Sequence, residues 1–439
     1  MNSGETYVTI RDELQQLVWL YKPRLFIYEW IPFDLNIFEE IAEELEAKNR
    51  EKGILITDEV DNYPEKAIFL KSPVASTVSV VEYRMNRLIR LEAFLGYPEV
   101  VEQVEKVGIE IRDYGGVIYG LEIEKVDGSE DGSLDKLARI IFDVMEDTSR
   151  LMSSILSLYQ RRVLNIIYPE YKEEGFERRK FIVVVASKVK VSDKKLAMSD
   201  VLKILLKEPY VNEIKQIIGP VIGFSQNDNL SVINGSYGTL VIGDLNDKNA
   251  LSLYASTKSL EMFLEDLLIN LWMVWEQLGE ARRIVTGGDV NELKKVRVQL
   301  INILSDFTLL KSVMSSISYT LNRIDNEYST IKNIPFLENL EFGKLFTAIK
   351  NRCRTIGDLF ESIEREIDGL LMIINTRIEE ALDRLNTLTF WLSIIFGSFG
   401  LGQLAVAIAP WFIGPVESTI ITALSIIIPV VLGLLYQKR

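Results

Sequence analysis

The C-terminal end of the chain carries two long apolar runs. A run of 32 uncharged residues, 385–416, is followed by Glu417 and then by 20 further uncharged residues. A helix that crosses a bilayer needs about 20 apolar residues, and the proline and glycine residues at the junction suit a turn. The pattern therefore predicts a transmembrane hairpin over residues 387–437, with spans near 387–409 and 418–436.

Upstream of this hairpin, apolar residues recur every three or four positions without interruption from Phe342 to Leu388. This spacing is typical of a helix that packs in a bundle or coiled coil. We expect one continuous helix over about 338–408 that runs directly into the first span. Two further helices are expected at about 246–283 and 290–330. Residues 246–386 would thus form a long helical stalk.

Helix 290–330 has a clear start signal. Asp289 is followed three positions later by Glu292, which is the spacing of a capping box. The dipeptide Ile334-Pro335 predicts a break before the long helix.

The first 245 residues alternate between strand and helix patterns and predict an α/β domain, with a possible subdomain break near 166–180. The expected strands are 24–30, 53–57, 66–70, 108–112, 117–123 and 179–191, from their β-branched and aromatic content. The expected helices are 34–50, 76–95, 134–165 and 195–207. Residues 229–242 predict a hairpin whose tight turn is Asn234-Gly235.

The distribution of basic residues predicts the orientation of the membrane hairpin. Arg377 and Arg384 precede the first span, Lys438 and Arg439 follow the second, and the connection carries no basic residue. Cytoplasmic flanks of spans are enriched in Lys and Arg. We therefore expect a multi-pass plasma membrane protein with both termini in the cytoplasm and the lipid bilayer as a partner.

The composition limits which partners and which kinds of functional site the chain can have. The chain has a net charge of −14, which argues against nucleic acid as a partner because phosphate backbones attract Lys and Arg. It has no histidine and a single cysteine, Cys353, so the usual zinc sites and histidine-based catalysis are excluded. We predict no enzyme, no catalytic residue and no resident cofactor. A metal ion here would have oxygen ligands, which suit Mg²⁺ or Ca²⁺ better than Zn²⁺.

The first span carries a stripe of polar and small residues at every third or fourth position. Such a stripe can line a pore with hydroxyl, amide and carbonyl oxygens. It can equally let helices approach closely, as small residues at Ser393 and Gly397 or at Ser398 and Gly402 would. The pore-lining candidates are Asn386, Thr389, Ser393, Gly397, Gly400 and Gln403.

The order of these parts resembles the CorA family of divalent cation channels. The local likeness is strongest in GLLMIINTRIEEALDRLNTLTFWLSIIF, residues 369–396, where Leu388-Thr389 precedes an Ile-rich span. The segment Gly-Pro-Val-Glu at 414–417 is similar to the acidic outer loop of the family.

The resemblance implies a homo-oligomer, a homopentamer in the family, with the first span lining the pore. It implies hydrated Mg²⁺ or Co²⁺ as cargo and regulator. It also implies that a group of hydrophobic side chains points into the pore and forms a gate that closes by dewetting. The gate candidates are Leu385, Leu388, Phe396 and Phe399.

The chain departs from the family at the outer end of the first span, where the family carries Gly-Met-Asn. No Gly-x-Asn occurs between residues 388 and 418, and the nearest similar segment is Gly-Leu-Gly-Gln at 400–403. The expected function is a divalent cation channel. The alternative is a protein of the same fold that no longer conducts divalent cations, either a membrane-anchored scaffold or a pore for another solute.

Three acidic residues are candidate cation ligands. Glu417 lies in the external turn, and Asp358 and Glu361 lie on the long helix, where an oligomer would arrange them in rings. The alternative for the two helical residues is a solvated helix face with local ion pairs around Arg365.

Overall fold

A computed structural model describes most of the helical half of the chain and part of the N-terminal half. The described residues are 18–32, 67–68, 75–82, 88–95, 107–112, 114–122, 131–156, 158–168, 179–191, 194–244, 248–408, 411 and 414–437. They form two compact units. Unit 1 comprises Met1–Val274 and Ser305–Glu361, and unit 2 comprises Trp275–Leu304 and Ser362–Arg439.

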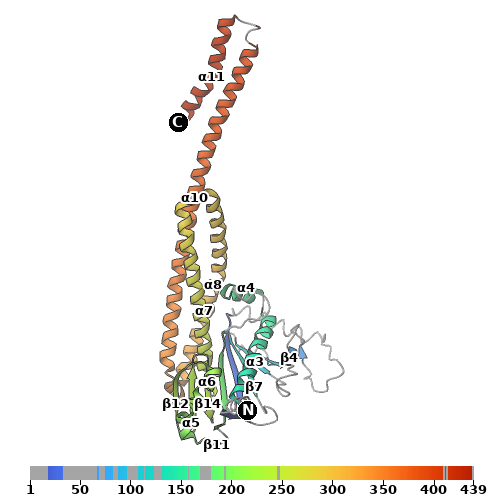
Figure 1. Cartoon of the computed structure of the whole chain (residues 1–439), viewed down its shortest axis with the longest axis vertical. Helices are drawn as coiled ribbons and strands as arrows, with labels where there is room; N and C mark the ends of the chain where they lie inside the picture. The colour runs from blue at the N-terminus through green and yellow to red at the C-terminus, as the bar shows by residue number, and fades with distance from the viewer. Residues whose placement is uncertain are drawn as a thin grey trace, which may run out of the picture. The chain divides into compact units, whose positions relative to one another are not determined.

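A mixed ten-stranded sheet is the framework of unit 1 (Figure 1). Its strand order is β12-β13-β14-β9-β2-β7-β6-β5-β4-β3. The strands are β2 Arg24–Trp30, β3 Ala67–Ile68, β4 Ala75–Glu82, β5 Leu88–Leu95, β6 Val107–Arg112, β7 Gly116–Glu122, β9 Phe181–Ala186, β12 Val221–Gln226, β13 Leu230–Gly235 and β14 Gly238–Gly243. Only β14 and β9 pair in parallel; the other neighbours are antiparallel. Every residue of β9 is buried, which explains its uninterrupted apolar sequence.

A second, four-stranded sheet has the order β11-β10-β1-β8. Its strands are β1 Val18–Tyr21, β8 Asp131–Ser133, β10 Lys188–Val191 and β11 Lys194–Lys195.

Among the described residues, these sheets are accompanied by the helices α3 Leu134–Ile155, α4 Leu158–Ile167, α5 Met198–Leu205 and α6 Tyr210–Ile218. A buried lysine ties α3 to the large sheet. Lys180, 2% exposed, donates to the backbone oxygen of Met145 at 2.7 Å and to Thr148 Oγ1 at 2.8 Å.

Helices α7 (Lys248–Gly287) and α8 (Val290–Ile331) pack on the sheet through Trp30. The Trp30 ring lies 4.5 Å from that of Phe263 on α7. Its Nε1 donates to the Tyr114 backbone oxygen at 2.9 Å and to Thr320 Oγ1 on α8 at 3.2 Å. Because a buried indole N–H needs a partner, these contacts fix how both helices meet the sheet.

Helix α9 (Pro335–Asn339) and helix α10 (Phe342–Ile408) follow α8. The expected break before the long helix is confirmed, but α10 begins at Phe342, after the separate turn of α9, and not at 338. Glu341, with φ +51°, is the residue that separates the two helices. Within unit 1, the Phe307 ring of α8 packs 4.8 Å from the Phe360 ring of α10.

The predicted strands at 24–30, 108–112 and 117–123 are confirmed, as is helix 195–207 in its α5 part. The predicted helix 76–95 is wrong, because this segment forms β4 and β5, which pair with each other, and β5 also pairs with β6. The β-branched residues of β4 favour strand once a partner strand is available. Helix 134–165 is two helices, broken at Leu156, whose backbone is extended. Strand 179–191 is β9 and β10, which belong to different sheets.

The predicted turn at Asn234-Gly235 is also wrong. Asn234 pairs with Thr239 inside the β13–β14 ladder, so the turn is Ser236-Tyr237. Asn234 Oδ1 accepts a hydrogen bond from Thr239 Oγ1 at 2.8 Å. A Cβ at Gly235 would overlap the backbone oxygen of Ile218, so this glycine serves close packing on α6 and not the turn.

Some sequence predictions fall outside the described residues. These are helix 34–50, strand 53–57, most of strand 66–70, residues 169–178 of the subdomain break, and Lys438 and Arg439.

Unit 2 contains the end of the α7–α8 pair, the C-terminal part of α10 and helix α11 (Pro415–Gln437). The capping box of α8 is confirmed. Asp289 Oδ1 accepts from the backbone N–H of Asn291 and Glu292 at 2.8 and 2.9 Å, and Glu292 Oε2 accepts from the Asp289 N–H at 3.0 Å.

By length and composition, three helices can cross a membrane: Val290–Ile331, Phe342–Ile408 and Val416–Leu434. The first of these, α8, carries polar side chains that are buried or paired with other elements within unit 1. Thr320 is fully buried, and Asp306 lies 3.8 Å from Arg162 of α4. The other two helices contain the spans that the sequence predicts.

Candidate functional site

The C-terminal hairpin of α10 and α11 is the first candidate site, and its inner face is defined by small residues. Ser398 is 2% exposed, and Gly402 is buried. A Cβ at Gly402 would lie 2.8 Å from Ile426 Cγ1 of α11, and one at Gly433 would meet the Ile394 side chain. Close contact at glycine is how helices commonly pack in membranes. Of the two small pairs in the sequence, Ser398 and Gly402 are therefore the pair that contacts α11.

The pore-lining candidates lie on the opposite face of α10. At 3.6 residues per turn, their stripe is about 160° around the helix from the face that contacts α11. All six side chains or glycines are exposed in the single chain: Asn386, Thr389, Ser393, Gly397, Gly400 and Gln403. Thr389 and Ser393 donate to the backbone oxygens of Leu385 and Thr389, each at 2.8 Å. Their hydroxyl protons are thus satisfied, and their oxygens keep acceptor capacity.

The four gate candidates are exposed as well. Leu385, Leu388, Phe396 and Phe399 are 62%, 61%, 71% and 58% exposed. They lie about 120° around α10 from the α11 face. The structure brings neither candidate set against another described element, so both remain available to a neighbour.

Glu417 is positioned as a helix cap. Its Oε2 accepts a hydrogen bond from the Gly414 backbone N–H at 3.2 Å, and Glu417 lies in the first turn of α11. An acidic residue suits this end of a helix. Among the described residues, no group of three or more acidic or cysteine side chains is arranged to hold a metal ion.

The other two metal candidates, Asp358 and Glu361, lie on α10 in unit 1 and are exposed. They stand away from the buried face of α10, which Ile356 and Phe360 form.

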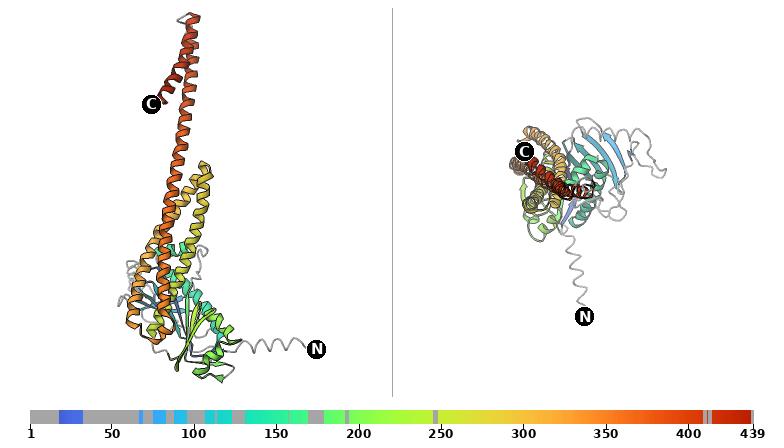
Figure 2. Two further views of the ribbon diagram at one scale, coloured as in Figure 1. Left: turned by 90° about the vertical axis from the view of Figure 1, so that its left-hand side faces the viewer. Right: turned by 90° about the horizontal axis from the view of Figure 1, so that it is seen from above.

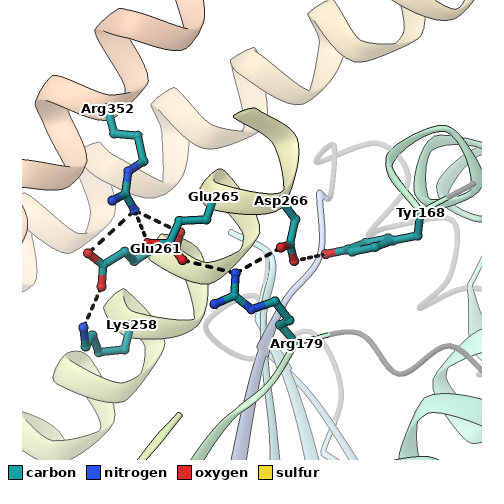
Figure 3. Close-up of polar contacts among 7 residues, drawn as sticks. All are labelled: Tyr168, Arg179, Lys258, Glu261, Glu265, Asp266 and Arg352. Atoms are coloured by element: carbon teal, nitrogen blue, oxygen red, sulfur yellow. Dashed lines mark hydrogen bonds and ion pairs between the residues drawn. The ribbon is translucent and has the colours of Figure 1, made fainter. Parts of the chain in front are cut away.

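Sequence reasoning missed a network of charges in unit 1 (Figure 3). Arg352 of α10 lies 3.7 Å from Glu261 and 3.1 Å from Glu265, both on α7. Lys258 also pairs with Glu261, at 2.6 Å. These contacts attach α10 to α7.

The same network reaches the sheet. Arg179, just before β9, lies 3.1 Å from both Glu265 and Asp266. Tyr168, after α4, donates to Asp266 Oδ2 at 3.1 Å. Burial raises the pKa of Asp266, partly offset by the Arg179 hydrogen bond. Arg179 and Arg352 lie 86 and 87 positions from Glu265 along the chain, so no local spacing rule signals the network.

One cysteine lies beside this network. Cys353 is partly buried, and burial raises the pKa of its thiol to about 11. A thiol of this kind is a packing group and not a nucleophile.

Comparison with known proteins identifies the N-terminal half. The model of the MJ1566 N-terminal domain family matches residues 13–245. The uncharacterized protein MJ1566 of Methanocaldococcus jannaschii is 23% identical over 372 residues, which cover 82% of this chain and 78% of that protein. The similarity therefore extends beyond the α/β domain into the long helices.

Proposed function

We propose that this chain, which belongs to the MJ1566 N-terminal domain family, is an oligomeric membrane protein of CorA-like organisation that conducts divalent cations. In this proposal α10 and α11 span the membrane, both termini are cytoplasmic, and α10 lines the pore. The cargo is a hydrated cation of the Mg²⁺ or Co²⁺ type.

The position of the polar stripe on α10 carries this proposal. The stripe lies opposite the face that contacts α11. In a ring of hairpins with α11 on the outside, the face opposite α11 is the one that points to the axis. The amides of Asn386 and Gln403 and the hydroxyls of Thr389 and Ser393 would then line it with oxygen atoms. Mg²⁺ gives up its water reluctantly, so neutral oxygen ligands suit a hydrated ion.

The continuity of α10 supports the same proposal. The helix runs without interruption from Phe342 to Ile408, so the segment held by the charge network and the proposed pore segment belong to one helix.

Flux into liposomes tests the proposal. The purified full chain is reconstituted, and entry of Mg²⁺ or Co²⁺ is followed with an enclosed indicator dye. We expect flux well above that of empty liposomes, and we expect the variant N386L/Q403L to reduce it at least tenfold because oxygen ligands are lost from the lining. L401A, on another face of the span, is the matched control. Flux no higher than in empty liposomes contradicts the proposal.

A second candidate function is a membrane-anchored scaffold, or a pore for another solute. The absence of Gly-x-Asn between residues 388 and 418 favours it. It predicts a chain that inserts and assembles but passes no divalent cation, so the same liposomes distinguish the two. Protein in the vesicle pellet with no divalent flux supports this second candidate.

A further inference from the structure

The end of α8 that belongs to unit 2 carries an exposed stripe of mixed character. Val290, Val298 and Ile301 are 37%, 58% and 47% exposed, and Lys294 and Arg297 are exposed beside them. These positions recur every three or four residues, so they share one side of the helix. Leu293, Val296 and Leu300 are buried on a different side.

Helix α10 carries a matching stripe in the same unit. Met372 is 73% exposed, and the acidic residues Asp368 and Glu379 are exposed four positions before it and seven after it. These residues share one side of the helix. Ile367, Leu370 and Ile374 form the buried side, which faces away from the stripe.

Two contacts show that the stripes occupy the same stretch of the stalk. Arg282 Nη2 of α7 lies 2.6 Å from Glu366 Oε1 of α10, and Arg377 of α10 donates to the Val285 backbone oxygen. The end of α7 therefore lies beside the segment of α10 between Glu366 and Arg377. Helix α8 begins just after this end and runs back beside α7 (Figure 2). Its first three turns thus lie level with Asp368 and Met372.

The two surfaces are complementary in charge. Segment 282–297, which covers the α7–α8 connection, has five basic and two acidic residues, a net charge of +3. Segment 366–383 of α10 has five acidic residues and one basic residue, a net charge of −4. A basic segment with exposed apolar residues is unusual in a chain of net charge −14, and the same chain supplies its acidic and apolar counterpart.

We propose that the α8 stripe of one copy docks on the α10 stripe of a second copy. Arg297 and Lys294 would lie against Asp368 and Glu379 of the second copy, with Val290 and Val298 covering Met372. Because the two surfaces differ, the contact is heterologous, and repeating it closes a ring when the rotation between copies allows. This inference rests on the assembly part of the proposed function and names the side chains that would hold the copies together.

A charge swap tests the contact in the full chain. The variant K294E/R297E and the variant D368K/E379K each place like charges across the proposed contact. We expect each to raise at least tenfold the protein concentration at which the detergent-purified oligomer half dissociates, as measured by mass photometry. The combined four-residue variant restores opposite charges and should recover most of the assembly. K207E/K215E changes two exposed lysines elsewhere and is the matched control.

A chemical cross-link provides a second, independent measurement. In a C353S background, one copy carries V298C and a differently tagged copy carries M372C. A short bismaleimide should join the two tags in membranes, and should fail when R297E is added. Absence of any joined product in the assembled protein overturns the proposal.

The outcomes separate this inference from the proposed function. A monomer in detergent and in membranes overturns both the assembly and this contact. An oligomer whose dissociation is unchanged by the charge reversals overturns this contact alone. An oligomer that is weakened by each charge reversal and restored by the combined variant, but that passes no cation, supports the contact and contradicts conduction.

Discussion

Arg352 and Glu265 lie 3.1 Å apart, the first on α10 and the second on α7. Glu265 also lies 3.1 Å from Arg179, which precedes the central strand β9. A single carboxylate therefore joins the long helix to the sheet of unit 1. The three side chains are about one-third exposed, so the network is accessible to solvent and responsive to salt.

Removal of Arg352 tests this attachment. The R352A variant leaves Glu261 and Glu265 without a shared cation and removes the hydrogen bond from Arg352 Nη1 to the Glu261 backbone oxygen. Hydrogen bonds to charged groups are worth about 1.5–3 kcal/mol. Because the pair is partly exposed, we expect a loss of about 1–2 kcal/mol in the free energy of unfolding, measured by urea denaturation. The R352K variant keeps the charge but loses the planar fork, so it should fall between wild type and R352A. R354A, two positions on, is the control.

The raised pKa of Glu213 predicts an unusual pH dependence of protein stability. Its Oε2 accepts from the Val18 N–H at 3.2 Å, and burial raises the pKa of its carboxyl to about 7. Between the ordinary pKa and about 7, the folded state keeps a proton that the unfolded state has lost. The contribution of Glu213 to stability therefore falls as the pH rises through this window.

The E213Q variant removes this titration. We expect a flatter dependence of the thermal midpoint on pH between about 4.5 and 7 than in the wild type, measured by circular dichroism. E338Q, at an exposed position, should leave the wild-type slope intact. An unchanged slope in E213Q contradicts the assignment.

Cys353 should resist alkylation in the folded protein. With its pKa raised to about 11 by burial, only a small fraction of the thiol is ionised at neutral pH, and the thiolate is the reactive form. We expect labelling by iodoacetamide at pH 7.5 to be slow, and to become fast in denaturant. T355C in a C353S background offers an exposed thiol two positions away and should react quickly without denaturant.

Substitutions at Gly402 and at Gly400 form a matched pair of variants that tests the packing of α10 on α11. A side chain at Gly402 would meet Ile426 at 2.8 Å, whereas nothing lies within 4 Å of a Cβ at Gly400. The G402V variant should separate α10 from α11, and G400V should not. Trp391, whose ring is 3.6 Å from a Cβ at Gly433, reports the separation through its fluorescence. Equal spectra for both variants in detergent contradict the packing.

The longest elements were predictable because their signals are local. The capping box of Asp289 and Glu292, the stripe along α10 and the strand 24–30 depend on residues within one element. The two failures at 76–95 and at Asn234-Gly235 depend on distant partners. β5 lies between β4 and the more distant strand β6 in the sheet, and Gly235 is required by Ile218, which precedes it by 17 positions.

The candidate site likewise has a part that the sequence identified and a part that only the packing of helices revealed. The sequence identified the polar stripe and both small-residue pairs, but a helix pattern has no reference direction around its axis. Only the packing of α11 on Ser398 and Gly402 distinguishes an inner face from the faces that remain exposed.

The order of the parts follows from the amino-acid pattern alone: an N-terminal α/β region, then long amphipathic helices, then an apolar hairpin. Composition and periodicity suffice for this, because the solvent preference of each side chain acts locally. The tertiary structure alone decided which face of α10 meets α11, where the β13–β14 turn lies, and which carboxylates meet Arg352 and Arg179. These depend on contacts between residues tens of positions apart, whose energies arise only when the chain has folded.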